Sequence, residues 1–191
     1  GPTMEDIDPV RYLSNHSSGK MGFALAGACA EAGAQVELIS GPVHLDAPNR
    51  VTVHPVTSAI EMCEQALALS AGADVFIGAA AVADYRPETT SAEKIKKSDG
   101  APLTLSLVEN PDIIACVAQS ASRPYMVVGF AAETESLMHH AREKRQRKRL
   151  DMIIANDVSD PDTTFGSEQN AVHLITEAQE QRLPLASKRV I

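Results

Sequence analysis

Three groups of residues in this 191-residue chain have types and spacings that suit a phosphate-bearing ligand. The run Asn15–Lys20 precedes a helical pattern, and the backbone N–H groups at a helix N-terminus attract anions. The run Arg142–Arg149 holds six of the 17 Lys and Arg residues, and in it Lys144 and Lys148 share one helix face. That spacing suits neighbouring phosphates of a triphosphate. Lys94 lies in a long excursion after a strand, where a lysine can reach a phosphate or a developing negative charge.

Each group also has a purely structural interpretation. Asn15–Lys20 can be a simple helix start, Arg142–Arg149 a solvated helix face with cations near the helix C-terminus, and Glu93–Lys97 a solvated charge run. The first run is not GxxxxGKS/T, because Met21 follows Lys20, and it is not GxGxxG. These patterns argue against a P-loop kinase and against a standard dinucleotide fingerprint. Spacing alone leaves both interpretations of each group open.

Short apolar runs alternate with helical patterns, and these elements must position the three groups. Unbroken apolar runs suit strands covered on both faces, as in a parallel sheet. The expected strands are Val36–Ser40, Val51–Val56, Val75–Ala83, Met126–Ala132 and Met152–Asn156, and the expected helices are Gly19–Ala32, Ser58–Ser70, Asp112–Gln119 and Thr134–Arg149. Ser58 and Glu61 form a capping box. The alternation predicts an α/β fold with a Rossmann-like, doubly wound, mostly parallel sheet and helices on both faces.

Two further runs, Leu103–Val108 and Ala171–Thr176, depart from this alternation, and we expect them to be antiparallel additions. The chain opens on Gly1-Pro2-Thr3, a turn, where a doubly wound fold normally has a buried strand. We therefore expect residues 1–191 to form a single domain that lacks its first strand and a C-terminal helix after Ile191.

Ligands of open α/β sheets bind beyond the carboxyl ends of the strands. Gly78–Ala81 have side chains small enough for a ligand to approach the backbone, and Asp84 follows them. Glu133, Asn156 and Asp157 come at the ends of two other expected strands. Polar residues thus converge at one sheet edge, either as a binding site or as ordinary loop polarity and helix capping.

Composition removes several classes of function. The formal net charge of −8 argues against general nucleic-acid binding. No stretch approaches the ~18 uncharged apolar residues of a membrane helix. Cys29, Cys63 and Cys116 are far apart, which favours buried free thiols in a reducing, cytoplasmic compartment. The six histidines show no metal-binding spacing, so we assign no metal cage made by the protein.

Five motifs in a fixed order resemble those of bacterial phosphopantothenate–cysteine ligases, which form the C-terminal half of the bifunctional coenzyme A biosynthesis protein. They are Gly1-Pro2-Thr3-x-Glu5-x-Ile7-Asp8-Pro9-Val10-Arg11, Asn15–Gly22, Ala80–Tyr85, Lys94–Lys97 and Asn110–Ile113, and the resemblance covers nearly all 191 residues. It implies that the carboxylate of 4′-phosphopantothenate attacks the α-phosphate of CTP, giving an acyl-cytidylate and pyrophosphate. The L-cysteine amine then displaces CMP, and Mg²⁺ is expected mainly on the triphosphate.

The resemblance also implies roles for single residues. Asn15 corresponds to the catalytic asparagine that contacts the acyl-cytidylate, and Lys94 to the lysine that steadies the triphosphate. CTP-binding positions are Gly78, Ala79, Ala80, Asp84, Lys94, Asn110, Pro111, Asp112, Ile113, Phe130, Lys144 and Lys148. Contacts to the acyl substrate are Asn15, His16, Arg11 and Ala81.

Members of this family are homodimers in which antiparallel strands cross to the partner, and the parent chain carries a flavin-dependent decarboxylase domain. The two antiparallel additions fit such a use. Two alternatives remain at this point: an NAD(P)-dependent Rossmann oxidoreductase, suggested by fold analogy alone, and a non-catalytic nucleotide-binding partner.

Overall fold

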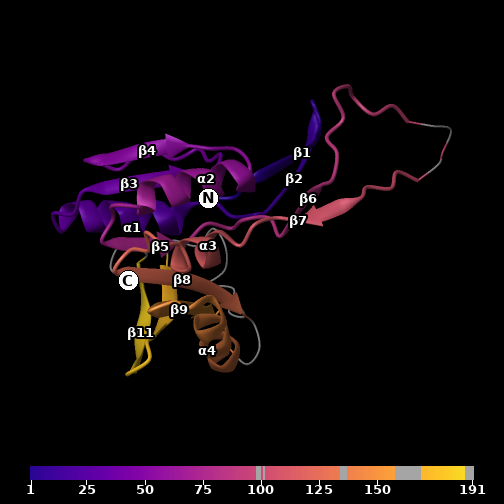
Figure 1. The fold of residues 1–191 in the computed structure, drawn as a ribbon. Coiled ribbons are helices and arrows are strands. Elements are labelled where there is room, and N and C mark those ends of the chain that lie inside the picture. The colour runs from indigo at the N-terminus through magenta and orange to yellow at the C-terminus, as the bar shows by residue number, and fades with distance from the viewer. Residues whose placement is uncertain (98–99, 101, 134–136, 158–168, 188–191) are drawn as a thin grey trace.

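Strands and helices alternate along most of the chain, and the computed structural model describes residues 1–97, 100, 102–133, 137–157 and 169–187 (Figure 1). The helices are α1 (Lys20–Glu31), α2 (Ala59–Ser70), α3 (Ile113–Ala118) and α4 (Leu137–Lys148). The strands are β1 (Met4–Asp8), β2 (Arg11–Ser14), β3 (Val36–Ser40), β4 (Val51–Pro55), β5 (Val75–Gly78), β6 (Tyr85–Pro87), β7 (Leu107–Glu109), β8 (Met126–Glu133), β9 (Met152–Asp157), β10 (Gln169–Ile175) and β11 (Glu180–Ser187).

A five-stranded sheet in the order β11-β10-β9-β8-β5 supports the carboxyl strand ends where ligands of such folds bind. Strands β5, β8 and β9 are parallel, whereas β10 and β11 add to them antiparallel. Strands β3 and β4 form a separate parallel pair. The predicted α/β class is confirmed, and so is an antiparallel addition at Ala171–Thr176.

The core forms where the aliphatic strands β8 and β9 meet the small and branched side chains of α2 and α3. Val117 of α3, Val127 of β8 and Ile153 of β9 are fully buried. Helix α2 begins at the predicted capping box, in which Ser58 Oγ accepts a hydrogen bond from the Glu61 N–H at 3.2 Å. These elements give the strand ends a rigid base.

Two glycines bring α3 close to the sheet. Gly78 of β5 lies opposite Gly129 of β8, and the side chain of Ile114 covers both. A Cβ at Gly78 would lie 2.9 Å from Ile114 Cδ1, and one at Gly129 would lie 2.7 Å from Leu150 Cδ1. Only hydrogen at both positions lets the start of α3 approach the strand ends.

Several expected boundaries were wrong. The strand expected over Val75–Ala83 ends at Gly78, because the chain then turns toward Pro2, which forms a parallel bridge with Ala81. The strand expected over Leu103–Val108 is limited to β7, which pairs antiparallel with β6 of the same chain. The hairpin β1–β2 and strand β11 were not anticipated.

Other expectations fall outside what the structure tests. Thr134, where the fourth helix was expected to begin, is outside the described residues, and α4 is described from Leu137. The missing first strand and final helix stay predictions. Within the described ranges, no helix combines the length and the apolar character that a membrane crossing requires.

Candidate functional site

The β1–β2 hairpin places Asn15 beside the small residues that follow β5. Ser14 Oγ donates a hydrogen bond to the Thr3 carbonyl at 2.7 Å, and Thr3 Oγ1 accepts one from the Ala83 N–H at 3.0 Å. Asn15 follows β2 directly, and its Nδ2 donates to the Ala81 carbonyl at 2.8 Å. Its amide is exposed and already forms a hydrogen bond at the strand end, so the structure brings two predicted site residues, Asn15 and Ala81, together.

Asn110 is fixed against the segment that contains Asp84. The Asn110 N–H donates to the Asp84 carbonyl at 2.8 Å, and Asn110 Nδ2 donates to the Ala83 carbonyl at 2.8 Å. Arg86 locks this arrangement, since its Nη1 donates to Asn110 Oδ1 at 3.2 Å and to the Glu109 carbonyl at 2.5 Å. Arg86 carried no sequence signal, because a single arginine in a polar stretch has no distinctive spacing.

Helix α4 brings both predicted lysines to the start of α3 and to β8. Lys148 Nζ lies 2.7 Å from Asp112 Oδ2, and the Lys148 side chain is only 16% exposed. Lys144 Nζ donates to the Phe130 carbonyl at 3.2 Å. Four positions expected from spacing and resemblance therefore form one cluster: Asp112, Phe130, Lys144 and Lys148. We call it the lysine cluster.

Asp112 has two structural tasks within this cluster. Its Oδ1 accepts a hydrogen bond from the Ala115 N–H at 3.2 Å and caps α3, while Oδ2 pairs with Lys148. Pro111 precedes it and Ile113 follows it, and Ile113 is buried in the core. The small size of Gly78 has a packing reason, because Ile114 occupies the space above it. Direct nucleotide contacts of Gly78, Ala79 and Ala80 stay predictions.

The first turn of α1 follows His16, which is exposed. Gly19 is the N-cap residue of α1 and has a left-handed φ of 78°, a conformation in which a side chain would be strained. A Cβ there would also lie 2.8 Å from Val43. This glycine explains how the chain turns from the Asn15 side into the helix.

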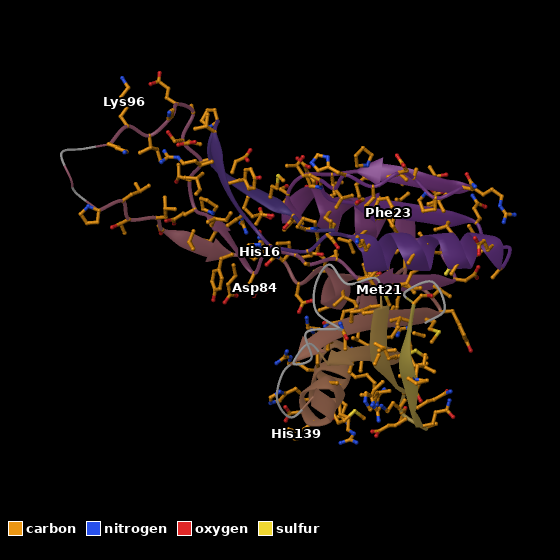
Figure 2. The ribbon with its side chains drawn as sticks, turned by 180° about the vertical axis from the view of Figure 1, so that it is seen from behind. His16, Met21, Phe23, Asp84, Lys96 and His139 are labelled. Atoms are coloured by element: carbon orange, nitrogen blue, oxygen red, sulfur yellow. The ribbon has the colours of Figure 1, made fainter. Side chains whose placement is uncertain are left out.

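Lys94 lies apart from the lysine cluster within one chain. The segment between β6 and β7 forms an extended arm that reaches away from the sheet and from α4 (Figure 1). Figure 2 shows Lys96, two residues further along, far out on this arm and well separated from Asp84. Arg11 also turns to the arm: it pairs with Asp8, and its Nη2 donates to the Ile95 carbonyl at 3.0 Å.

Surface hollows and possible metal sites lie elsewhere or are absent from the part of the chain that is described. One hollow of about 470 Å³ lies between Phe23 of α1 and Arg50, and another of about 500 Å³ between Arg145 and Thr176. Neither is lined by a predicted site residue. Among the described residues, no group of three or more His, Cys, Asp or Glu could hold a metal ion.

Comparison with known proteins connects the lysine cluster and the hairpin to one family. A family model described as the DNA/pantothenate metabolism flavoprotein C-terminal domain matches residues 1–191. The Coenzyme A biosynthesis bifunctional protein CoaBC of Escherichia coli K12 is 53% identical over 194 residues, which are 100% of this chain and 48% of that protein. The chain spans about half the length of the curated relatives it matches.

Solved structures agree with this result. A crystal structure of the C-terminal domain of a CoaBC protein matches with a TM-score of 0.82 and 36% identity, covering 100% of this chain and 85% of that one. A Cab2 mutant in complex with phosphopantothenate-cysteine matches with a TM-score of 0.80 and 16% identity, covering 99% and 80%. At that identity the second match shows the fold alone.

Proposed function

Because this chain belongs to the DNA/pantothenate metabolism flavoprotein C-terminal domain family, we propose that it joins 4′-phosphopantothenate to L-cysteine with CTP as co-substrate. The carrying observation is the lysine cluster, in which two ammonium groups, a backbone carbonyl and the start of α3 meet. The name of the E. coli relative and the ligand named for the Cab2 structure support the same reaction.

In the first step, the phosphopantothenate carboxylate attacks the α-phosphate of CTP, and pyrophosphate leaves. Both reactants are anionic, so the barrier falls mainly through charge neutralisation and alignment. Lys144 and Lys148 are assigned to the triphosphate. Asp112 holds Lys148 until the phosphates arrive, and the ammonium then exchanges or shares this partner. Mg²⁺ supplies further neutralisation when bound, and it is usually held by substrate phosphates with one or two carboxylates.

In the second step, the cysteine amine attacks the acyl carbonyl, and CMP leaves. Negative charge develops on the carbonyl oxygen, and a positioned amide N–H stabilises it. Asn15 Nδ2 is assigned this role, because it is exposed and forms a hydrogen bond at the same strand end as Ala81. His16 and Arg11 remain proposed contacts to the acyl substrate.

We assign a homodimer to this protein, with each active site completed by the partner. Lys94 lies on the arm and does not reach the lysine cluster of its own chain. Large apolar side chains are exposed on the two ribbons beside the arm: Val10, Tyr12, Tyr85, Leu103 and Leu107. Such side chains favour burial against a second copy. The arm then carries Lys94 into the partner's nucleotide site.

The cellular setting follows from the relatives. They carry two activities in one chain, and we assign the other half of the parent protein to a flavin-dependent decarboxylase that uses the product of this ligase. Cytoplasmic localisation fits a reaction on soluble, phosphorylated metabolites.

Pyrophosphate release tests the proposal. The protein is incubated with CTP, Mg²⁺ and 4′-phosphopantothenate, and we expect pyrophosphate without cysteine and CMP with amide product once cysteine is added. Lys94→Gln should abolish the first step with the fold intact, while Lys97→Gln on the same arm serves as the matched control. Pyrophosphate at the wild-type rate from Lys94→Gln would remove Lys94 from the mechanism. Calorimetric binding of NADPH but not CTP would instead support an oxidoreductase.

A further inference from the structure

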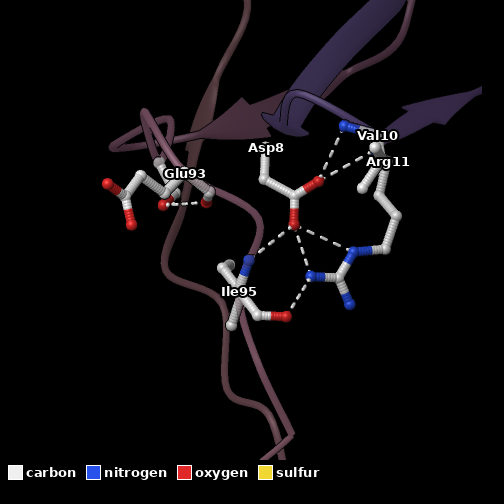
Figure 3. A network of polar contacts seen from close by, with 6 residues as sticks. Asp8, Val10, Arg11, Glu93 and Ile95 are labelled. Carbon is white, nitrogen blue, oxygen red and sulfur yellow. Dashed lines mark hydrogen bonds and ion pairs between the residues drawn. The ribbon is translucent and has the colours of Figure 1, made fainter.

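Asp8 at the end of β1 is a carboxylate enclosed by donors. The residue is 1% exposed, and its Oδ1 accepts hydrogen bonds from the Val10 and Arg11 N–H groups, each at 3.0 Å. Its Oδ2 accepts from the Arg11 guanidinium, with the Nε contact at 3.0 Å, and from the Ile95 N–H at 3.1 Å (Figure 3). Every donor lies in the turn of the hairpin or in the arm.

The arm is gripped at the peptide next to Lys94. Asp8 binds the N–H of Ile95, and Arg11 binds the carbonyl of the same residue at 3.0 Å (Figure 3). Two further hydrogen bonds join the arm to β1, from the Ser91 N–H to the Ile7 carbonyl at 3.0 Å and from Thr90 Oγ1 to the Asp6 carbonyl at 3.1 Å. The backbone around Lys94 is therefore attached to the hairpin, although the arm beyond it extends into solvent.

The charge state of Asp8 makes this attachment durable. The hydrogen bond from Arg11, reinforced by the Val10 and Ile95 N–H groups, holds the pKa of the Asp8 carboxyl well below its usual range, although burial acts in the opposite direction. Removal of the carboxylate would leave the Arg11 guanidinium and the Ile95 N–H without their partner. The arm would then lose its fixed point at the base.

The same hairpin ends at Asn15. Strand β2 runs from Arg11 to Ser14, and Asn15 follows with its own hydrogen bond to Ala81. One rigid ribbon therefore carries the attachment of the lysine arm at its turn and the proposed oxyanion donor at its other end.

We propose that Asp8 is a positioning residue for the first chemical step, which sets the place of Lys94 through Arg11 and the Ile95 peptide. The inference rests on the proposed function, since it requires that Lys94 acts on the triphosphate. Asp8 itself contacts neither substrate nor nucleotide.

The test compares Asp8→Asn with Asp6→Asn, an exposed aspartate two residues earlier on β1. We expect Asp8→Asn to lower kcat for pyrophosphate release about 10- to 100-fold, because small displacements of an aligned group have effects of that size. The KM for 4′-phosphopantothenate and the conversion of supplied acyl-cytidylate by cysteine should change less than twofold. Trypsin should cleave after Lys94 and Lys96 faster than in the wild type, and Asp6→Asn should alter neither readout.

A double variant separates positioning from a general loss of structure. Asp8→Asn combined with Lys94→Gln should be no slower than Lys94→Gln alone, because the effect of Asp8 passes through Lys94. Further slowing of the double variant would contradict the proposal. Where Asp8→Asn does not fold, Ile95→Pro removes the single N–H donated by the arm and leaves the Asp8–Arg11 pair, and it should give the same two changes.

The outcomes distinguish the two proposals. No pyrophosphate from the wild type with CTP would overturn the proposed function and this inference with it. An active wild type in which Asp8→Asn and Asp6→Asn behave alike would overturn the positioning role alone.

Discussion

Lys148 combines a structural and a proposed functional role in one ammonium group. Its partner Asp112 is 46% exposed, so the pair contributes only ~0–1 kcal/mol to stability. A triphosphate in the same place would gain far more from that cation than Asp112 does, because it brings several charges. Binding and folding can thus be separated at this residue.

Lys148→Met should weaken CTP binding at least about tenfold, the usual size of a lost charged hydrogen bond, while the unfolding free energy falls by ~1 kcal/mol or less. Arg147→Met is the matched control, since Arg147 is exposed and lies one residue away on α4. Titration calorimetry gives the affinity and urea denaturation the stability. Equal affinities for both variants would exclude Lys148 from the nucleotide site.

Cys63 is the cysteine with the most perturbed surroundings. Burial raises the pKa of its thiol to about 11, and neighbouring Cys116 adds to the increase. The predicted free thiols agree with the structure, although Cys29 and Cys116 are only half-buried. At pH 8 we expect iodoacetamide to modify Cys63 most slowly, as followed by mass spectrometry.

The same shift has a sign in alkaline solution. Above a pH of about 8.5 the thiol ionises in the unfolded chain but not in the folded one, so its stabilising contribution is lost as the pH rises toward about 11. The difference in unfolding free energy between the wild type and Cys63→Ala should therefore shrink from pH 7 to pH 10. A constant difference would mean that Cys63 titrates normally.

At the scale of elements, the contact of α3 with the sheet depends on glycine. Gly129→Ala places a methyl group 2.7 Å from Leu150 Cδ1 and 3.0 Å from Ile114 Cδ1. We expect a loss of ~1–3 kcal/mol in unfolding free energy, typical of overpacking. Gly22→Ala in α1 is the control, because no atom lies within 4 Å of its Cβ and alanine favours helix. Equal stabilities in urea would show that Ile114 and Leu150 can move aside.

The predicted elements were those whose sequences are continuous apolar runs. Residues Val36–Ser40 were predicted with the observed bounds, because VELIS is mainly apolar and β-branched. The hairpin sequences MEDID and RYLS and the last strand, EQRLPLAS, contain too many polar residues for that criterion. Their stability comes from strand pairing and from contacts such as Asp8 with Ile95, 87 residues apart, which no local pattern contains.

The site was predictable to the same degree. Lys144 and Lys148 could be placed on one helix face from their spacing, and motif resemblance supplied Asn15, Lys94 and Asn110. The family assignment from these motifs is confirmed by a match over residues 1–191. Which residues meet depends on long-range geometry: Lys148 with Asp112, Arg86 with Asn110, and the arm with the hairpin.

At the scale of the whole molecule, the distance between the arm and the lysine cluster gives the dimer a specific test. Lys94→Gln and Lys148→Met each remove one half of a site that, in a dimer, is built from two chains. When equal amounts of the two variants exchange subunits, half of the dimers are mixed, and each mixed dimer has one intact site. Pyrophosphate release should therefore return to about one quarter of the wild-type rate, as estimated from random pairing.

Sites made within one chain would give no such recovery, because every chain in the mixture carries one defect. Each variant treated alone by the same exchange procedure provides the baseline. Sedimentation at the assay concentration supplies the independent check, since a monomeric wild type with full activity would contradict the shared site. Recovery to a quarter, together with a dimer in solution, would mean that Lys94 serves the nucleotide bound by its partner, and that the extended arm is a catalytic element rather than a loose loop.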